Sequence, residues 1–315
     1  MKDFSGRLLD FHTHSTCSDG SDSPKELVRK AKQEGIVALA LTDHNVISGL
    51  EEFNYWCKKQ GIISIPFGME FFAELPEGIV SIDENAAPDL VLLAKSPRVG
   101  CLEDYFKFLL DDREKRFIPE ILNGLSSAGF YVPSVNLKEQ AKILGIPPIF
   151  RSIVYEKNNL QKLVDYVHQK DLNIKEEEII NNPARFMNQY LYAVGKPAHS
   201  KRIVGFDLKD AISLAKEANC KIFIAHPGGP FGNLSERVLE YMISEGVNGI
   251  EVRNYFNSPE QNQYFDKLAK EHNLIKSGGS DYHGLFGQSK LGMKDRVKNQ
   301  LNSEILNNLL DGLPS

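Results

Sequence analysis

The chain has 315 residues, a formal net charge of −5 and 42% hydrophobic residues. This length allows one large α/β domain, or a barrel with an insertion, around a substantial core. The negative charge argues against a broad basic surface for nucleic acid, although a local cationic site stays open. We expect a cytoplasmic protein without a membrane role, because the sequence contains no long apolar run, no room for a signal peptide and no C-x-x-C spacing.

The first strong feature is a pair of histidines that follows the apolar residues Leu8 and Leu9. His12 and His14 are two residues apart, so on a strand their side chains point to the same side and could share an ion. Imidazole nitrogens suit zinc, manganese or iron, and the nearby carboxylate of Asp19 suits the harder of these ions. For this pair alone, two strand-end histidines bonded to the backbone are the alternative.

The segment after this pair predicts a helix, a strand and a second helix. Ser23 and Glu26 form the signature of a capping box before a helix that stops at Gly35. The run 36–41 is apolar without alternation, as in a parallel strand that is covered on both faces. A second helix is expected over 47–60, with Gly61 as its stop. Ser258 and Gln261 form a second capping-box signature, before a later helix.

Seven apolar runs are strand candidates, and helices join most of them, which implies an α/β protein with a parallel sheet. The first run begins at Leu8, and the others are 36–41, 62–67, 90–94, 222–225, 249–252 and 274–277. Polar residues at or just beyond the ends of runs would gather on the catalytic face if the sheet closes into a β/α barrel. These residues are His12, His44, Glu70, His226, Asp281 and His283.

Residues 97–197 interrupt this rhythm and are predicted to be mainly helical. The better helical segments are 104–125, 138–144, 160–168 and 185–191. We therefore expect a barrel made of residues 1–96 and 198–315, and an inserted helical domain of residues 97–197 that caps the barrel mouth and binds substrate. Arg113 and Arg116 would share a helix face in this domain. The alternative for both is a solvated arginine paired with Asp112 or Glu120.

The candidate metal ligands are too many for one ion and enough for two or three. They are His12, His14, Asp19, His44, Glu70, His226, Asp281 and His283. Clustered divalent ions suit phosphate ester cleavage, because they lower the pKa of a bound water and hold the oxygens of the transferring phosphoryl group. Asp10 and Asp43, each beside a candidate ligand, are expected to orient imidazoles. The candidate catalytic residues are Asp43, Arg113 and Arg116.

Several motifs resemble, in order, those of the PHP (polymerase and histidinol phosphatase) superfamily. They are D-F-H-T-H-S with S-D-G, L-T-D-H, G-M-E, A-H-P-G-G and G-G-S-D-Y-H-G. The resemblance covers nearly the whole chain. The motif R-E-K-R in the insertion resembles the sequence of the branch that cleaves phosphate from nucleotides. It implies a distorted (β/α)7 barrel with a mainly helical inserted cap and two or three Mn, Fe or Zn ions. By position it implies one ion on His12, His14, Glu70 and Asp281, a second on Glu70 and His226, and a third on Asp19, His44 and His283.

The same resemblance implies a small phosphorylated substrate. A metal-bound hydroxide would remove phosphate from a 5′-nucleotide such as AMP or from a 3′,5′-bisphosphate nucleotide, and short RNA ends are a further candidate. No stable nucleic-acid partner is expected. The implied substrate-binding residues are Arg113, Arg116 and Arg151. His199 could contact phosphate or supply a missing ligand, or be structural.

One departure from the family concerns Val91, which our alignment places where a histidine usually completes the second ion site. A degenerate, non-enzymatic PHP module is therefore one alternative. A histidinol-phosphate phosphatase is another, although the long insertion fits the nucleotide branch better. A C–N hydrolase of the amidohydrolase type would need a bridging lysine, for which Lys95 is the nearby candidate.

Overall fold

The structure is a computed structural model that describes most of the chain. The described residues are 7–76, 78–79, 88–134, 153–192, 195–200, 207–229, 234–287, 289–295, 300–301 and 303–314. The predicted helix 138–144 and Arg151 lie outside them. The chain divides into two compact units, Met1–Phe106 with Val204–Ser315, and Lys107–Ile203.

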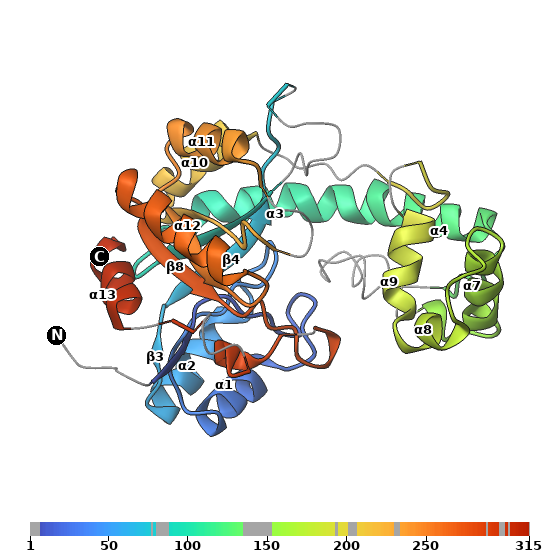
Figure 1. The fold of residues 1–315 in the computed structure, drawn as a ribbon, viewed down its shortest axis with the longest axis horizontal. Helices are drawn as coiled ribbons and strands as arrows, with labels where there is room; N and C mark the ends of the chain where they lie inside the picture. Colours follow the sequence, from blue (N-terminus) through green and yellow to red (C-terminus); the bar gives the residue numbers. More distant parts are fainter. Residues whose placement is uncertain are drawn as a thin grey trace. The chain divides into compact units, whose positions relative to one another are not determined.

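The N-terminal part of the first unit contains three short parallel strands and two helices. These are β1 (Leu8–Asp10), α1 (Pro24–Gln33), β2 (Ile36–Leu39), α2 (Leu50–Gln60) and β3 (Ile63–Ser64), with the strands in the order β1-β2-β3. Ser23 caps α1, and both hydrogen bonds of the predicted capping box with Glu26 are formed. Helix α2 ends at the predicted residue, Gly61, whose backbone is left-handed. Helices α1 and α2 pack against each other (Figure 1).

Five strands form a second sheet in chain order. They are β4 (Phe67–Phe72), β5 (Asp89–Ala94), β6 (Lys221–Ile224), β7 (Gly249–Asn254) and β8 (Ile275–Gly279). The prediction of a parallel sheet is wrong for β5, which is antiparallel to both β4 and β6. Every residue of β5 is buried, so its apolar run has no alternation, and such a run does not reveal the direction of the strand. Among the residues described between β4 and β5 there is no helix, and an antiparallel pair needs none.

The predicted strand 62–67 is interrupted in the structure. Its first part is β3, and its last residue, Phe67, begins β4. Pro66 lies between the two strands and has no N–H with which to continue a ladder. As a result Glu70 lies inside β4, and not beyond the end of a strand as we predicted.

Isolated bridges, formed mostly by residues that follow the strands, connect the two sheets. Thr13 pairs with Tyr282 and His44 pairs with Glu70, both in parallel orientation. The segment after β1 is also bonded to the segment after β8, because Asp281 donates its N–H to the carbonyl of His12 at 2.9 Å. The described hydrogen bonds define a mixed α/β fold with two sheets, and closure into a seven-stranded barrel stays a prediction.

One helix precedes β6, and further helices follow β6, β7 and β8. They are α10 (Leu208–Glu217), α11 (Glu236–Glu245), α12 (Pro259–Glu271) and α13 (Ser303–Gly312). The predicted capping box of Ser258 and Gln261 is formed at the start of α12, which buries Phe265, Leu268 and Ala269. Within the described stretches, no helix combines the length and apolar character needed to cross a membrane.

The second unit is mainly helical and has its own apolar core. Its elements are the end of α3 (Gly100–Asp112), η1 (Arg113–Phe117), α4 (Ile118–Ser127), α7 (Asn159–His168), α8 (Glu176–Asn181), α9 (Pro183–Met187) and η2 (Asn188–Tyr192). Phe117, Leu125 and Leu163 are among the residues buried in its core. The turn η1 is a π-helix. Pro119, near the start of α4, has no N–H with which to bond to a carbonyl of this turn.

Candidate metal centre

Close packing of β8 against the first motif, D-F-H-T-H-S at residues 10–15, positions His12. Phe11 donates its N–H to the carbonyl of Gly278 at 3.2 Å. A Cβ atom on Gly279 would lie 2.3 Å from the backbone nitrogen of His12, which is closer than atoms can approach. Glycine at this position therefore allows β8 to lie directly beside the predicted ligand.

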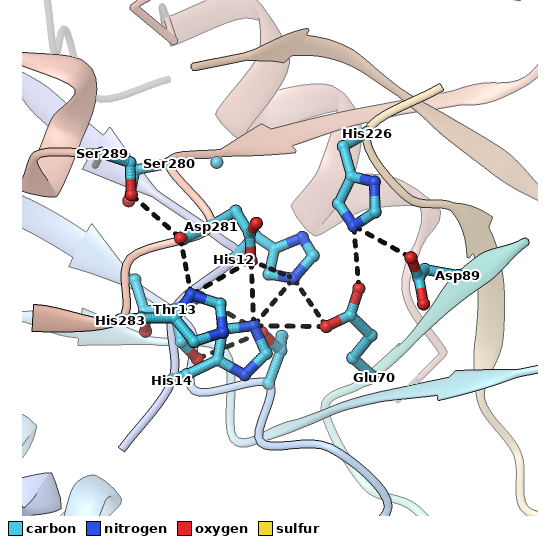
Figure 2. A network of polar contacts seen from close by, with 12 residues as sticks. His12, Thr13, His14, Glu70, Asp89, His226, Ser280, Asp281, His283 and Ser289 are labelled. Atoms are coloured by element: carbon cyan, nitrogen blue, oxygen red, sulfur yellow. Dashed lines mark hydrogen bonds and ion pairs between the residues drawn. The ribbon is translucent and has the colours of Figure 1, made fainter. Parts of the chain in front are cut away.

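Glu70 lies at the middle of the centre, in contact with four histidines. Its Oε2 atom is 3.2 Å from His12 Nε2, from His14 Nε2 and from His44 Nδ1. Its Oε1 atom is 3.1 Å from His226 Nε2. The Glu70 side chain is only 1% exposed, and Figure 2 shows it between His226 and the histidines of the first motif. A buried carboxylate with two oxygens in use is suited to bridging two ions.

Two groups of side chains are close enough to hold one ion each, with ligand atoms within 4.8 Å of one another. The groups are His12, Glu70, His226 and Asp281, and His14, Asp19, His44 and His283. The structure thus brings together all eight residues that we predicted as ligands. In the second group, Asp19 Oδ1 is 3.2 Å from His283 Nε2 and 3.8 Å from His14 Nδ1. His14 also contacts the first group, since its Nε2 atom is 3.2 Å from Asp281 Oδ1.

The chemistry of these residues fits divalent ions. His14 Nδ1 is buried and has no hydrogen-bond partner, and a buried imidazole nitrogen without a partner is costly unless it binds something. Imidazole and carboxylate groups in this mixture are typical ligands of Zn, Mn and Fe. We therefore expect the two groups to hold ions.

The carboxylates and histidines of the centre shift one another's pKa values. Burial raises the pKa of Glu70, but the charges of His12 and His44 outweigh burial and bring this pKa well below its usual value. Burial opposes protonation of His226, yet the hydrogen bond to Glu70 and the charge of Asp89 raise its pKa to about 10. Burial lowers the pKa of His44 to about 4. Bound ions would take the place of the histidine protons, because an imidazole nitrogen must lose its proton to bind a metal.

Two of the predicted ligands have unusual backbones. His226, with φ 24°, and Asp281, with φ 54°, have positive φ values that residues other than glycine seldom adopt. Hydrogen bonds hold both in place: His226 donates its N–H to Glu251 Oε2 at 2.7 Å, and Asp281 donates to the carbonyl of His12. Backbone strain of this kind tends to occur at functional sites.

Glu251 on β7 is a residue of the site that sequence reasoning missed. Its Oε1 atom is 2.8 Å from His12 Nδ1, and its Oε2 atom accepts the N–H of His226. Glu251 therefore orients two of the predicted ligands, and it is 1% exposed. The signal was a charged residue inside the otherwise apolar run 249–252, where a glutamate is seldom found without a partner.

Asp10 and Asp43 bond to serine hydroxyls and backbone N–H groups in the described contacts, and their predicted role in orienting imidazoles stays a prediction. Asp43 accepts hydrogen bonds from Ser15 N, Ser15 Oγ and Ser18 Oγ at 2.6–2.7 Å. Asp10 accepts from the N–H and the hydroxyl of Ser280 and from the N–H of Gly292. Both carboxylates fix the loops that carry ligands, because buried backbone N–H groups there need acceptors.

The direction of β5 determines which of its residues lies near the centre, where the family resemblance led us to expect a histidine at Val91. Val91 is buried in this strand opposite Glu70. Because β5 is antiparallel to its neighbours, the start of the strand, and not its end, lies at the centre. Asp89 occupies that start, and its Oδ2 atom is 3.5 Å from His226 Nε2. Lys95 follows the opposite end of β5, about 20 Å along the strand, so the lysine needed by a C–N hydrolase is not at the centre.

The predicted substrate residues of the second unit have local partners. The guanidinium of Arg116 donates to both carboxylate oxygens of Asp112, at 2.7 and 2.8 Å, and to Glu120. The guanidinium of Arg113 lies over the ring of Phe117 at 5.3 Å. His199 is exposed, and its Nδ1 atom is 3.1 Å from the carbonyl of Tyr192. A substrate role for these residues, and for Arg151 outside the described stretches, stays a prediction.

Comparison with known proteins gives matches over most of the chain. Residues 10–193 match the PHP domain family. A 5′-3′ exoribonuclease of Haemophilus influenzae is 30% identical over 293 residues, which are 91% of this chain and 93% of that protein. A 3′,5′-nucleoside bisphosphate phosphatase of Chromobacterium violaceum is 27% identical over 87% of each chain. The crystal structure of a protein of Bifidobacterium adolescentis, proposed to be a metal-dependent phosphoesterase, matches with a TM-score of 0.69 and 20% identity over 100% of this chain and 99% of that chain, which shows a shared fold.

Proposed function

This chain belongs to the PHP domain family and is a metal-dependent phosphoester hydrolase, and on that premise we propose that it removes phosphate from a small nucleotide. The proposed substrates are a 5′-nucleotide such as AMP and a 3′,5′-bisphosphate nucleotide. The relative from Chromobacterium violaceum, named a 3′,5′-nucleoside bisphosphate phosphatase, supports the second.

The contact of Glu70 with four histidines is the observation that carries this proposal. A single buried carboxylate reaches both groups of candidate ligands, so two or three ions held by these groups would lie close together. Bound divalent ions would supply an activated water and positive charge for the phosphoryl oxygens. We also propose that the two sheets close as a distorted (β/α)7 barrel around this centre.

The buried residues of the centre would hold ions, and its more exposed residues would lie on the side of the substrate. The side chains of His12 and Glu70 are at most 1% exposed, so they would hold ions without touching solvent. His44 and His283 are 13% and 17% exposed, so the phosphate would approach on their side. Arg113, Arg116 and Arg151 of the second unit would bind the remaining phosphate oxygens, with His199 as a further contact.

A second candidate substrate is the 5′ end of a short RNA. The relative from Haemophilus influenzae, named a 5′-3′ exoribonuclease, favours it. The same ion centre could act on a phosphate at the end of a chain or on a free nucleotide, so the choice depends on residues that contact the base and sugar.

A substrate panel tests the proposal. Manganese-loaded protein is incubated with AMP, 3′,5′-bisphosphoadenosine, histidinol phosphate and a 5′-phosphorylated oligoribonucleotide, and the released phosphate or nucleotide is measured. We expect rapid phosphate release from a nucleotide and its loss in the His12→Ala variant. Preference for histidinol phosphate, or hydrolysis that the variant retains in full, would overturn the proposal.

Metal analysis separates the remaining alternative, a degenerate module. Such a module should bind little metal and hydrolyse nothing in the panel. If the protein binds ions but hydrolyses none of the four substrates, the result would support the ion centre and contradict the proposal of a nucleotide substrate.

A further inference from the structure

His226 faces carboxylates from two neighbouring strands. Its Nε2 atom is 3.1 Å from Glu70 Oε1 on β4 and 3.5 Å from Asp89 Oδ2 on β5. Figure 2 shows the two carboxylates converging on this one nitrogen. The side chains of His226 and Asp89 are only 8% and 9% exposed. Two carboxylate oxygens and an imidazole nitrogen within this range are suited to binding one divalent ion.

The backbone holds Asp89 at this position from both sides. On one side it pairs with Phe72 of β4, two residues beyond Glu70. On the other side its carbonyl accepts the N–H of Ala225 at 3.1 Å, and Ala225 directly precedes His226. Glu70 and Phe72 are two residues apart on β4, so the side chain of Asp89, opposite Phe72, lies on the same face of the sheet as that of Glu70. The strand pairing therefore places Asp89 beside both other ligands, whatever occupies the centre.

We propose that Asp89 is a protein ligand of the ion held by Glu70 and His226. As a ligand, Asp89 would replace the histidine that the family resemblance led us to expect at Val91. This inference rests on the proposed function only because it needs the centre to bind divalent ions, and it does not depend on the identity of the substrate.

The exchange of an imidazole for a carboxylate has a chemical consequence. A site with Glu70, Asp89 and one histidine is richer in oxygen and more negative than a site with two histidines. Carboxylate ligands suit Mn²⁺, whereas imidazole suits Zn²⁺ better. We therefore expect this site to favour Mn²⁺ more strongly than it would with a histidine in place of Asp89.

The test is the metal content of two variants, measured without reference to activity. Wild-type protein, Asp89→Asn and Asp89→His are stripped with a chelator, reloaded with Mn²⁺, with Zn²⁺ or with an equal mixture, and desalted, and bound metal is measured by mass spectrometry. Asp111→Asn is the matched control, because Asp111 is an exposed aspartate on α3 that pairs with Lys115. Circular dichroism of the stripped proteins checks that every variant is folded.

We expect Asp89→Asn to lose about one Mn²⁺ per chain relative to wild type, and the control to lose none. Asp89→His should regain the ion, but with a ratio of Mn²⁺ to Zn²⁺ in the mixture about tenfold or more below that of wild type, which corresponds to about 1.4 kcal/mol of relative affinity. Full Mn²⁺ content in folded Asp89→Asn would overturn the inference while leaving the proposed function intact. An unchanged metal ratio in Asp89→His would also overturn it. Wild-type protein that binds no ions would instead refute the proposed function.

Discussion

The two units of this chain use charged side chains in opposite ways. In the first unit, Glu70 is 1% exposed and its partners are histidines that come from distant parts of the sequence. In the second unit, the Arg116 side chain is 30% exposed and its carboxylate partners, Asp112 and Glu120, lie four residues away on either side.

The difference has a physical meaning. Water and neighbours on the same helix satisfy an exposed pair, and such a pair contributes little to stability. A buried group of carboxylates and histidines has no such option and must hold its charges in balance with protons or metal ions. The first arrangement is therefore the stronger indication of a functional centre, and the following predictions test that ranking.

The largest effect is expected from Glu70→Ala. This change removes the carboxylate that contacts all four central histidines, so both ion groups lose a shared ligand. We expect phosphate release to fall on the order of 10³-fold, since bound ions contribute several kcal/mol of transition-state stabilisation. Activity is measured with excess Mn²⁺, and folding is checked by circular dichroism. An active Glu70→Ala enzyme would show that the buried group is not the catalytic centre.

A smaller effect is expected from Glu251→Gln. The glutamine keeps the shape of the side chain but loses the charge that orients His12 and supports His226. Removal of a group that orients metal ligands typically weakens metal affinity or activity about 10–100-fold. Titration of stripped protein with Mn²⁺ measures the affinity, and Glu271→Gln on the exposed face of α12 is the control. If both variants bind Mn²⁺ as wild type does, Glu251 has only a packing role.

The second unit is tested by Arg116→Ala. If this arginine binds a substrate phosphate, KM should rise about tenfold while the metal content stays unchanged, because one charged hydrogen-bonding group is lost. Arg29→Ala on α1, whose guanidinium contacts Gln33, serves as the control. An unchanged KM would leave Arg116 as a surface arginine that only pairs with its neighbours.

The smallest effect concerns pH and the ion-free protein. Burial opposes protonation, but nearby carboxylates raise the pKa values of His12 and His14, and they raise those of His226 and His283 to about 10. His44 is the one of these five histidines in which burial outweighs the carboxylates, so its pKa is lowered to about 4. A raised pKa stabilises the fold below the unfolded value of about 6.5, and this contribution is lost as the pH rises toward 10.

We therefore expect the melting temperature of stripped protein to fall by about 2–4 °C from pH 6.5 to pH 9. The gain in melting temperature on adding Mn²⁺ should be larger at pH 9, because metals compete with protons for imidazole. Thermal unfolding with a chelator and with Mn²⁺ measures both. A Mn²⁺ gain that is larger at pH 6.5 than at pH 9 would contradict metal binding by these histidines.

The sequence by itself determined the local elements and the set of candidate ligands. The capping boxes at Ser23 and Ser258 appear as predicted, because they depend on residues within one turn of helix. Six of the eight candidate ligands could be recognised because each is a polar residue close to an apolar run, and His14 and Asp19 because they follow His12 closely. All eight lie in the two groups of the structure.

Only the tertiary structure decided the direction of β5 and the residues that depend on it. A strand buried on both faces has the same apolar pattern in either direction. The sequence therefore left Val91, inside β5, and Lys95, beyond its end, as the positions to consider, whereas Asp89 at the start of the strand lies beside His226. Glu251 likewise became part of the centre only when strand pairing brought β7 to His12. Hydrogen bonds between distant strands decide which end of a buried strand faces a site, and no local pattern of residues contains that information.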